Sequence, residues 1–204
     1  MVCATEALKR LRDGNQRFVS GVRSIETMLN QSRREQFSTG QQPFAIILGC
    51  SDSRVPAEIV FDQGLGDLFV IRVAGNIVAP SQIGSVEFAA EQFKTRLVVV
   101  MGHTQCGAVC ATLDEMQRPK GEQSKNIQSI VNRIRPSLEP FMGTELWQKR
   151  DELIKHATRA NVRASVNQLR RSSELLEGLI EHDGLVIVGA EYDLQTGKVD
   201  FFDD

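Results

Sequence analysis

The most constraining feature of the sequence is an apolar run that ends in reactive side chains. Residues 44–48 are all apolar, they lie between Pro43 and Gly49, and Cys50 follows directly. A run of this length bounded by proline and glycine is typical of a strand buried on both faces, as in parallel sheets. The thiol of Cys50 is therefore expected at the carboxyl end of a buried strand.

The same pattern returns further along the chain. Residues 97–101 form a second apolar run, which ends at Gly102 and is followed by His103 and Cys106. In open α/β sheets, sites form beyond the carboxyl ends of strands where the strand order reverses. If the two runs are neighbouring strands, Cys50, His103 and Cys106 lie together at that edge.

The remaining patterns alternate between helix and strand. Further strands are expected over 67–73, 185–188 and 198–202, and helices over 4–20, 56–61, 82–94 and 106–116, with a short helical piece near 32–37. Helical patterns fill most of 126–182, with breaks near Pro136, Pro140 and Gly143. This order predicts an α/β fold: a mostly parallel central sheet of order 2-1-3-4 plus a short edge strand, with flanking helices.

Composition limits the classes of function. The chain has 204 residues, 41% hydrophobic and 25% charged, and a net charge of −2. One domain over 1–204 is expected, with an N-terminal helical arm over 1–42 and an α/β core over 43–204. The balanced charge gives no reason to expect nucleic acid or a membrane as partner. Four cysteines without a secretory signal favour a reducing compartment, so we expect a cytoplasmic protein.

Thiolate and imidazole are the ligands that zinc prefers. Catalytic zinc sites keep three protein ligands and leave one position for water. His103-Thr104-Gln105-Cys106 alone is a weak signal, and Cys50 at a matching strand end strengthens it. The alternative is a pair of structural cysteines beside a loop histidine. The repeated strand ends favour one zinc ion, Zn²⁺, per subunit.

Asp52 and Arg54 lie two positions apart in the loop after the first strand. A carboxylate beside an arginine has a lowered pKa and stays ionised at neutral pH. It then serves as a hydrogen-bond acceptor near the metal or as a competing fourth ligand. A loop salt bridge of little energetic value is an equally good interpretation of the spacing alone.

Taken together, these motifs resemble those of the β-class carbonic anhydrases. The resemblance rests on Cys50-Ser51-Asp52-Ser53-Arg54 and His103-Thr104-Gln105-Cys106, and continues through residues 55–58, 66–70, 72–76 and 84–88. It is dense over residues 44–109, and the rest of the chain has a compatible plan of helices and strands.

The resemblance implies a lyase that reversibly hydrates carbon dioxide to bicarbonate and a proton by zinc-bound hydroxide. It implies that Cys50, His103 and Cys106 bind zinc, and that Asp52 and Arg54 form a catalytic dyad. In a closed form of such enzymes, Asp52 would be the fourth zinc ligand. A hydrolase of carbon disulfide or carbonyl sulfide and a non-catalytic zinc protein with a structural or redox role are the alternatives. The intact dyad argues against the latter.

The resemblance also implies a substrate pocket shared between subunits. By position, four residues would bind substrate: Gln41, Phe69, Ala74 and Phe88. For the last three, a place in the hydrophobic core is an equally good interpretation. A homodimer or homotetramer is implied, with N-terminal helices packed on the partner, and the apolar stripe of Leu8, Leu11 and Phe18 fits such a role.

Two further positions bear on regulation and on the metal. One subgroup of the family is inhibited by bicarbonate at a second site built from a Trp, an Arg and a Tyr. Ile47 stands at the Trp position here, although Arg72 and Tyr192 are present. No strong inhibition of this kind is expected. Cys110, one helical turn after Cys106, is an alternative fourth ligand that would close the zinc site.

Overall fold

The computed structural model describes residues 2–24, 38, 40–117 and 124–202. Its centre is a five-stranded sheet of order β2-β1-β3-β4-β5. The strands are β1 (Ala45–Gly49), β2 (Leu68–Arg72), β3 (Leu97–His103), β4 (Val186–Tyr192) and β5 (Val199–Phe202). The first four are parallel and β5 is antiparallel to β4. The predicted fold class and strand order are confirmed.

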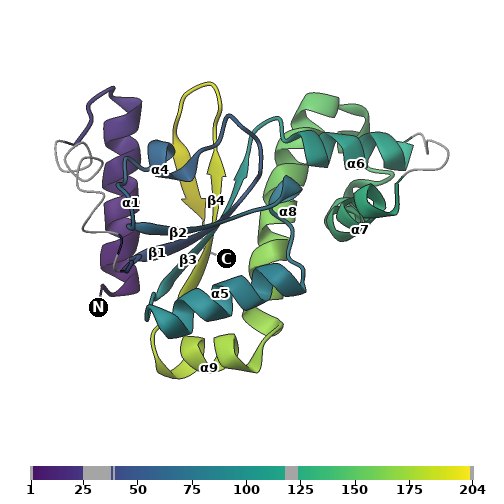
Figure 1. Cartoon of the computed structure of the whole chain (residues 1–204). Coiled ribbons are helices and arrows are strands. Elements are labelled where there is room, and N and C mark those ends of the chain that lie inside the picture. The colour runs from purple at the N-terminus through teal and green to yellow at the C-terminus, as the bar shows by residue number, and fades with distance from the viewer. Residues whose placement is uncertain (1, 25–37, 39, 118–123, 203–204) are drawn as a thin grey trace.

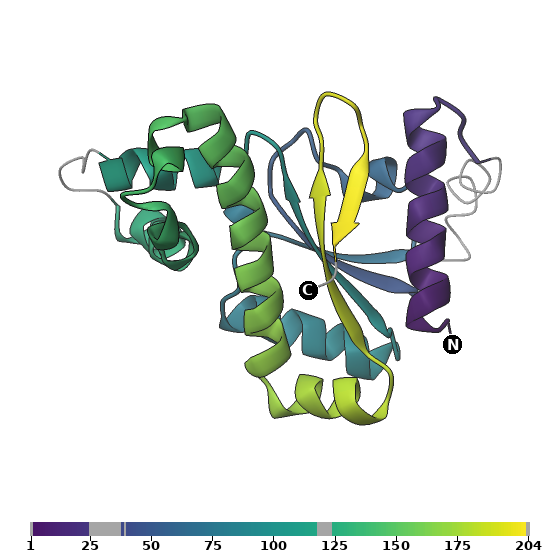
Figure 2. The same cartoon turned by 180° about the vertical axis from the view of Figure 1, so that it is seen from behind.

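The helices cover both faces of this sheet (Figures 1 and 2). They are α1 (Ala4–Val19), α4 (Ala57–Val60), α5 (Pro80–Gln92), α6 (Gly107–Gln117), α7 (Lys125–Leu138), α8 (Arg150–Arg171) and α9 (Glu174–His182), with short 3₁₀ turns η1 (Ala74–Asn76), η2 (Glu139–Phe141) and η3 (Glu145–Gln148). Helices α1 and α4 lie on one side, whereas α5, α8 and α9 lie on the other. The helix predicted near 32–37 lies outside the described residues. None of the described helices is both long and apolar enough to cross a bilayer.

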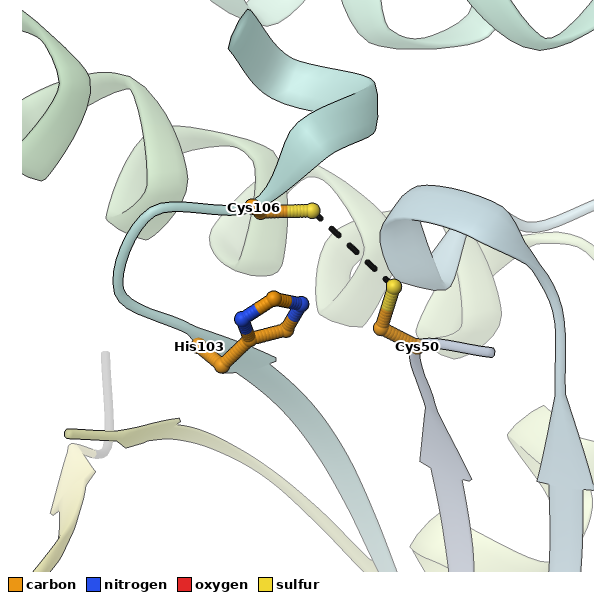
Figure 3. A group of neighbouring side chains, drawn as sticks. All are labelled: Cys50, His103 and Cys106. Atoms are coloured by element: carbon orange, nitrogen blue, oxygen red, sulfur yellow. Dashed lines mark hydrogen bonds between the residues drawn. The ribbon is translucent and has the colours of Figure 1, made fainter. Parts of the chain in front are cut away.

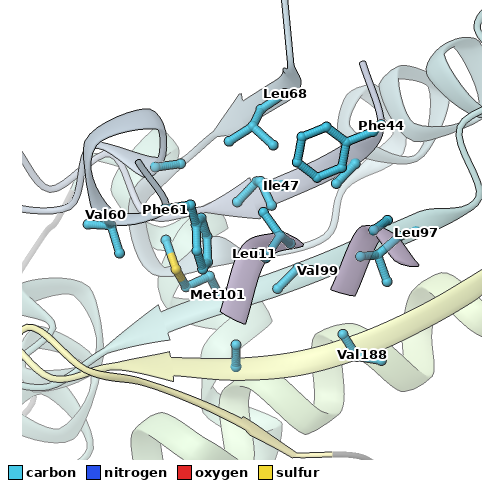
Figure 4. Close-up of a cluster of buried hydrophobic side chains, with 14 of the residues drawn as sticks. Leu11, Phe44, Ile47, Val60, Phe61, Leu68, Leu97, Val99, Met101 and Val188 are labelled. Carbon is cyan, nitrogen blue, oxygen red and sulfur yellow. The ribbon is translucent and has the colours of Figure 1, made fainter. Parts of the chain in front are cut away.

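Alternation along the strands explains why both faces of the sheet are buried. On β1, Ile47 packs into the cluster under α1, while Ile46 and Leu48 face the cluster under α5 and α8. All three side chains are fully buried. Figure 4 shows the first cluster, in which Leu11 of α1 lies against β1 and β3. A sheet covered on both sides has strands that are apolar throughout, which is the pattern seen in the sequence.

Helix α1 is fixed to its own chain. Leu11 is fully buried in the cluster on β1 and β3. The amide of Asn15 donates to the carbonyls of Val60 at 3.1 Å and Gly197 at 2.9 Å. The Asn15 side-chain oxygen accepts a hydrogen bond from the amide of Val199 at 2.9 Å. The expectation that this stripe packs on a partner is therefore wrong for Leu11, because the chain's own sheet covers it.

The predicted break at Pro136 is also wrong, because α7 runs through this residue to Leu138. A proline inside a helix costs about 3 kcal/mol. The apolar face of α7 continues on both sides of it, with Val131, Ile134 and Leu138 buried. Burying side chains of this size contributes about 1.5–3 kcal/mol each, which outweighs the proline. The breaks at Pro140 and Gly143 are present, since η2 and a left-handed glycine follow α7.

Candidate metal centre

The carboxyl ends of β1 and β3 bring three ligand side chains together (Figure 3). Cys50 follows β1 directly, His103 is the last residue of β3, and Cys106 stands just before α6. The two strands are parallel neighbours with Gly49 opposite Met101, so their ends meet at one edge. The two Sγ atoms are 4.0 Å apart. All three ligand atoms lie within 4.8 Å of one another.

His103 presents one ring nitrogen to this group and uses the other in the protein. Its side chain is fully buried. Nδ1 is 2.9 Å from the carbonyl oxygen of Thr104, to which it donates as N–H. Nε2 is then the nitrogen with a free lone pair, and it is buried without a hydrogen-bond partner among the residues that the structure describes. A metal ion between Nε2 and the two sulfurs would satisfy this nitrogen, so the donor set fits zinc.

A hydrogen bond links the two sulfurs and shifts the pKa values of the two thiols in opposite directions. The hydrogen bond between the sulfurs and, after it, burial raise the pKa of Cys106. The pKa of Cys50 is lowered, chiefly because its thiolate accepts this hydrogen bond. The amide of Gly75 also donates to Cys50 Sγ at 3.4 Å. A pair that already favours one thiolate is suited to a cation, since zinc binds deprotonated sulfur.

Cys110 does not join this group. It lies in α6, where its amide donates to the carbonyl of Cys106 at 2.9 Å. In the part of the chain that the structure describes, the side chains gathered for a metal are Cys50, His103 and Cys106. The donor set therefore has two sulfurs and one nitrogen. This is the three-ligand arrangement of zinc sites that keep a fourth position open.

Asp52 and Arg54 form a two-point ion pair beside the three ligands. Arg54 Nε lies 2.9 Å from Asp52 Oδ1, and Arg54 Nη2 lies 2.7 Å from Oδ2. These hydrogen bonds hold the pKa of Asp52 well below its usual range. Asp52 Oδ2 is 3.8 Å from the Nε2 atom of His103. The ionised carboxylate of Asp52 therefore lies next to the histidine nitrogen that would bind a metal ion.

Arg72 has a role that the sequence analysis did not find. From the last position of β2, its Nε donates to the carbonyl of Cys50 at 3.0 Å and its Nη2 to the carbonyl of Asp52 at 2.6 Å. Both bonds fix the backbone of the loop that carries the ligand and the carboxylate. The position of Arg72 at the end of β2 could have indicated this role, because β2 is the strand next to β1.

The four predicted substrate residues are not gathered in one place. Ala74 begins η1, next to the Gly75 amide that contacts Cys50. Phe69 pairs with Ile46 near the start of β1, at the end of the sheet opposite to Cys50. Phe88, on α5, packs on Phe69 with ring centroids 6.2 Å apart.

Gln41 likewise lies at the amino ends of the strands. It is exposed, and it lines a cavity of about 530 Å³ together with Phe44, Phe93 and Thr95. The residues lining this cavity include none of the three ligand side chains. Within one chain, only Ala74 among the four predicted substrate residues is next to the candidate metal centre.

Comparison with known proteins places the chain in a family. The family model described as carbonic anhydrase matches residues 45–199. A carbonic anhydrase of Mycolicibacterium smegmatis is 40% identical over 198 residues, which covers 95% of this chain and 91% of that protein.

Solved structures show the same fold. The β-carbonic anhydrase CafA of Aspergillus fumigatus superposes with a TM-score of 0.76 and 25% identity, covering 87% of this chain and 83% of that one. A tetrameric β-carbonic anhydrase of Sordaria macrospora gives a TM-score of 0.74 at 22% identity, covering 88% and 90% of the two chains. With the family match and the sequence relative, this likeness identifies the chain as a member of the β-class carbonic anhydrases.

Proposed function

We propose that this protein catalyses the reversible hydration of carbon dioxide with one zinc ion per subunit, held by Cys50, His103 and Cys106. The observation that carries the proposal is the buried Nε2 of His103. In the described part of the chain this nitrogen has no hydrogen-bond partner; it lies within 4.8 Å of two buried sulfurs and 3.8 Å from an ionised carboxylate. Leaving a buried polar atom unsatisfied costs about 1–3 kcal/mol, which favours a ligand at this point.

Zinc, when bound, lowers the pKa of a water molecule to about 7, so that hydroxide is available at neutral pH. The carboxylate of Asp52 would accept a hydrogen bond from the hydroxide that attacks carbon dioxide and would thereby orient it. Arg54 holds both oxygens of Asp52, at 2.9 and 2.7 Å, and keeps the carboxylate ionised. Arg72 holds the loop backbone beneath them through the carbonyls of Cys50 and Asp52.

Asp52 also determines whether the fourth metal position is open. As a ligand it would close the centre, and as a partner of Arg54 it leaves that position to water. Two charge-assisted hydrogen bonds to one guanidinium favour the second arrangement. The ion pair between Asp52 and Arg54 therefore favours the open form.

Substrate binding at a subunit interface is part of the proposal. Gln41, Phe69 and Phe88 are remote from their own chain's metal centre, so they would act at the site of a partner, with Ala74 contributed by the chain that holds the metal. Phe88 is 53% exposed, which suits an apolar contact between subunits. The Sordaria relative is a tetramer, and we propose a homodimer or homotetramer here. The four cysteines are free, in keeping with a reducing compartment such as the cytoplasm.

A stopped-flow assay with a pH indicator tests this function. Wild type, zinc-depleted protein and Cys50→Ser would be mixed with carbon dioxide, and the zinc content of each would be measured. We expect fast, zinc-dependent acidification with wild type and a loss of about 100-fold or more with Cys50→Ser. Cys110→Ser is the matched control, since Cys110 lies outside the ligand group, and it should retain zinc and activity. Zinc-loaded wild type without acceleration would refute the proposal.

A further inference from the structure

The turn that follows β2 has an unusual backbone. In η1, Gly75 has φ 70° and Asn76 has φ 43°, so two successive residues are left-handed. A Cβ atom on Gly75 would lie 2.7 Å from Ile134 Cδ1 and 3.0 Å from the Cβ of Ala108. Both the conformation and the close packing on α6 and α7 require glycine there. Successive left-handed residues persist only where the surrounding structure holds them.

A hydrogen bond links this turn to the candidate metal centre. The amide of Gly75 donates to Cys50 Sγ at a distance of 3.4 Å. A backbone N–H aimed at a thiolate stabilises the negative sulfur and orients its remaining lone pairs. Loss of a hydrogen bond to a metal ligand typically costs about 10–100-fold in metal affinity or activity.

Helix α8 holds the turn from the opposite side. Asn161 Nδ2 donates to the carbonyl of Gly75 at 2.8 Å, and Ser165 Oγ donates to the carbonyl of Asn76 at 3.0 Å. The two side chains lie one helical turn apart on the same face of α8, and are 2% and 4% exposed. Gly102 of β3 permits this close approach, since a Cβ there would lie 2.6 Å from Val162 Cγ2.

We propose that Asn161 and Ser165 are positioning residues for the metal centre. By binding the two carbonyls of the strained turn, they aim the Gly75 amide at Cys50 Sγ and so set the strength and geometry of zinc binding by that sulfur. This inference rests on the proposed function. Neither residue touches the metal ligands, and their effect passes through the backbone of η1.

Removing either side chain should free the turn. A buried carbonyl left without its donor is unfavourable, so η1 would relax and its amide would leave the sulfur. Zinc would then bind about 10-fold more weakly, as is typical for the loss of a partner of a metal ligand. Because both side chains act on one turn, the double variant should lose less than the product of the two single effects.

The test compares Ser165→Ala and Asn161→Leu with Thr158→Val. Thr158 is a matched control: it lies on the same helix, is 2% exposed, and its hydroxyl has no hydrogen-bond partner among the described residues. The zinc dissociation constant of each folded protein would be measured by competition with a chromophoric chelator. The cobalt-substituted forms would be compared by their sulfur-to-metal charge-transfer absorption, which reports directly on the bond to the thiolate.

We expect Ser165→Ala and Asn161→Leu to weaken zinc binding about 10-fold and to shift the charge-transfer band, while Thr158→Val matches wild type. If Asn161→Leu does not fold, the smaller change Ser165→Ala decides the question. If Ser165→Ala and Asn161→Leu match Thr158→Val in zinc affinity and in charge-transfer absorption, this inference is wrong, and the proposed function is unaffected. Wild type that neither binds zinc nor hydrates carbon dioxide would overturn the proposed function, and the inference with it.

Discussion

Arg54 binds both carboxylate oxygens of Asp52, and one of these oxygens stands 3.8 Å from the buried Nε2 of His103. The ion pair is partly open to solvent, with the Arg54 side chain 54% and the Asp52 side chain 17% exposed. Surface ion pairs of this kind contribute little to stability. We therefore infer that its role is geometric, because the two hydrogen bonds from Arg54 fix the direction in which the carboxylate points.

Replacing Arg54 by lysine tests this geometric role. Lysine keeps the positive charge but binds as a single point, so Asp52 loses its fixed orientation. We expect kcat/KM for carbon dioxide hydration to fall by roughly 10–100-fold at neutral pH, with the zinc content unchanged. Arg150→Lys is the matched control, because Arg150 pairs with Asp114 at 2.8 Å and neither residue belongs to the ligand group. Equal activity of the two variants would show that charge alone is sufficient at position 54.

Asp193 gives a pH-dependent contribution to stability. Its Oδ1 accepts hydrogen bonds from the amides of Gln195 and Thr196 and from the Thr196 hydroxyl, in the turn between β4 and β5. The Thr196 amide is the main reason that the pKa of Asp193 is lowered from its ordinary 3.8. A lowered pKa in the folded state means stability that is present above pH 3.8 and is lost as the pH falls through the folded value.

We therefore expect Asp193→Ala to reduce the free energy of unfolding by about 1 kcal/mol at neutral pH, and by less at about pH 3. Urea unfolding at both pH values measures the difference. Asp193→Asn is the control, because it keeps an acceptor oxygen without the charge. Its deficit should be smaller at both pH values and should fall toward acid by the same amount as that of Asp193→Ala, because both variants lack the titrating carboxyl. A deficit in Asp193→Ala that grows toward acid would contradict the assignment.

Much of the fold and the centre of the site could be predicted, because both depend on local patterns. Two apolar runs that end in glycine determine two buried parallel strands, and adjacent parallel strands place Cys50 and His103 at one edge. The helix through Pro136 was missed because its cause is tertiary. Burial of Ile134 and Leu138 outweighs the local preference of proline to break a helix.

The supporting residues of the site could not be predicted for a related reason. In the sequence, Asn161 and Ser165 look like ordinary polar residues of a helix. The carbonyl groups that they bind lie 86 and 89 residues away in the chain. No local pattern records such a contact. Gln41 and Phe88 raise a different difficulty, since their predicted roles depend on a second chain.

The buried state of Ile47 leads to a prediction on regulation. Ile47 is fully buried in the core under α1, and the guanidinium of Arg72 is bound to two carbonyls. A second bicarbonate site built from a Trp, an Arg and a Tyr would need both positions. We expect added bicarbonate to lower the initial hydration rate gradually, without cooperativity, with sodium chloride of equal ionic strength as the control. A steep, sigmoidal loss of activity near neutral pH would contradict this.

The exposed ring of Phe88 is expected to hold subunits together. Phe88 is 53% exposed and packs edge-on against Phe93 with centroids 5.7 Å apart, beside Phe69. Burying such a ring contributes about 1.5–3 kcal/mol to association. A carboxylate at this position would lose that contribution and would also add the cost of its own desolvation. Phe88→Glu should therefore shift the mass measured by light scattering toward a smaller species and lower the activity, while zinc stays bound. Ile127→Glu is the matched control, since Ile127 is 55% exposed on α7. If both variants keep the wild-type mass, Phe88 does not lie in a subunit interface, and its predicted role at a partner's site fails with it.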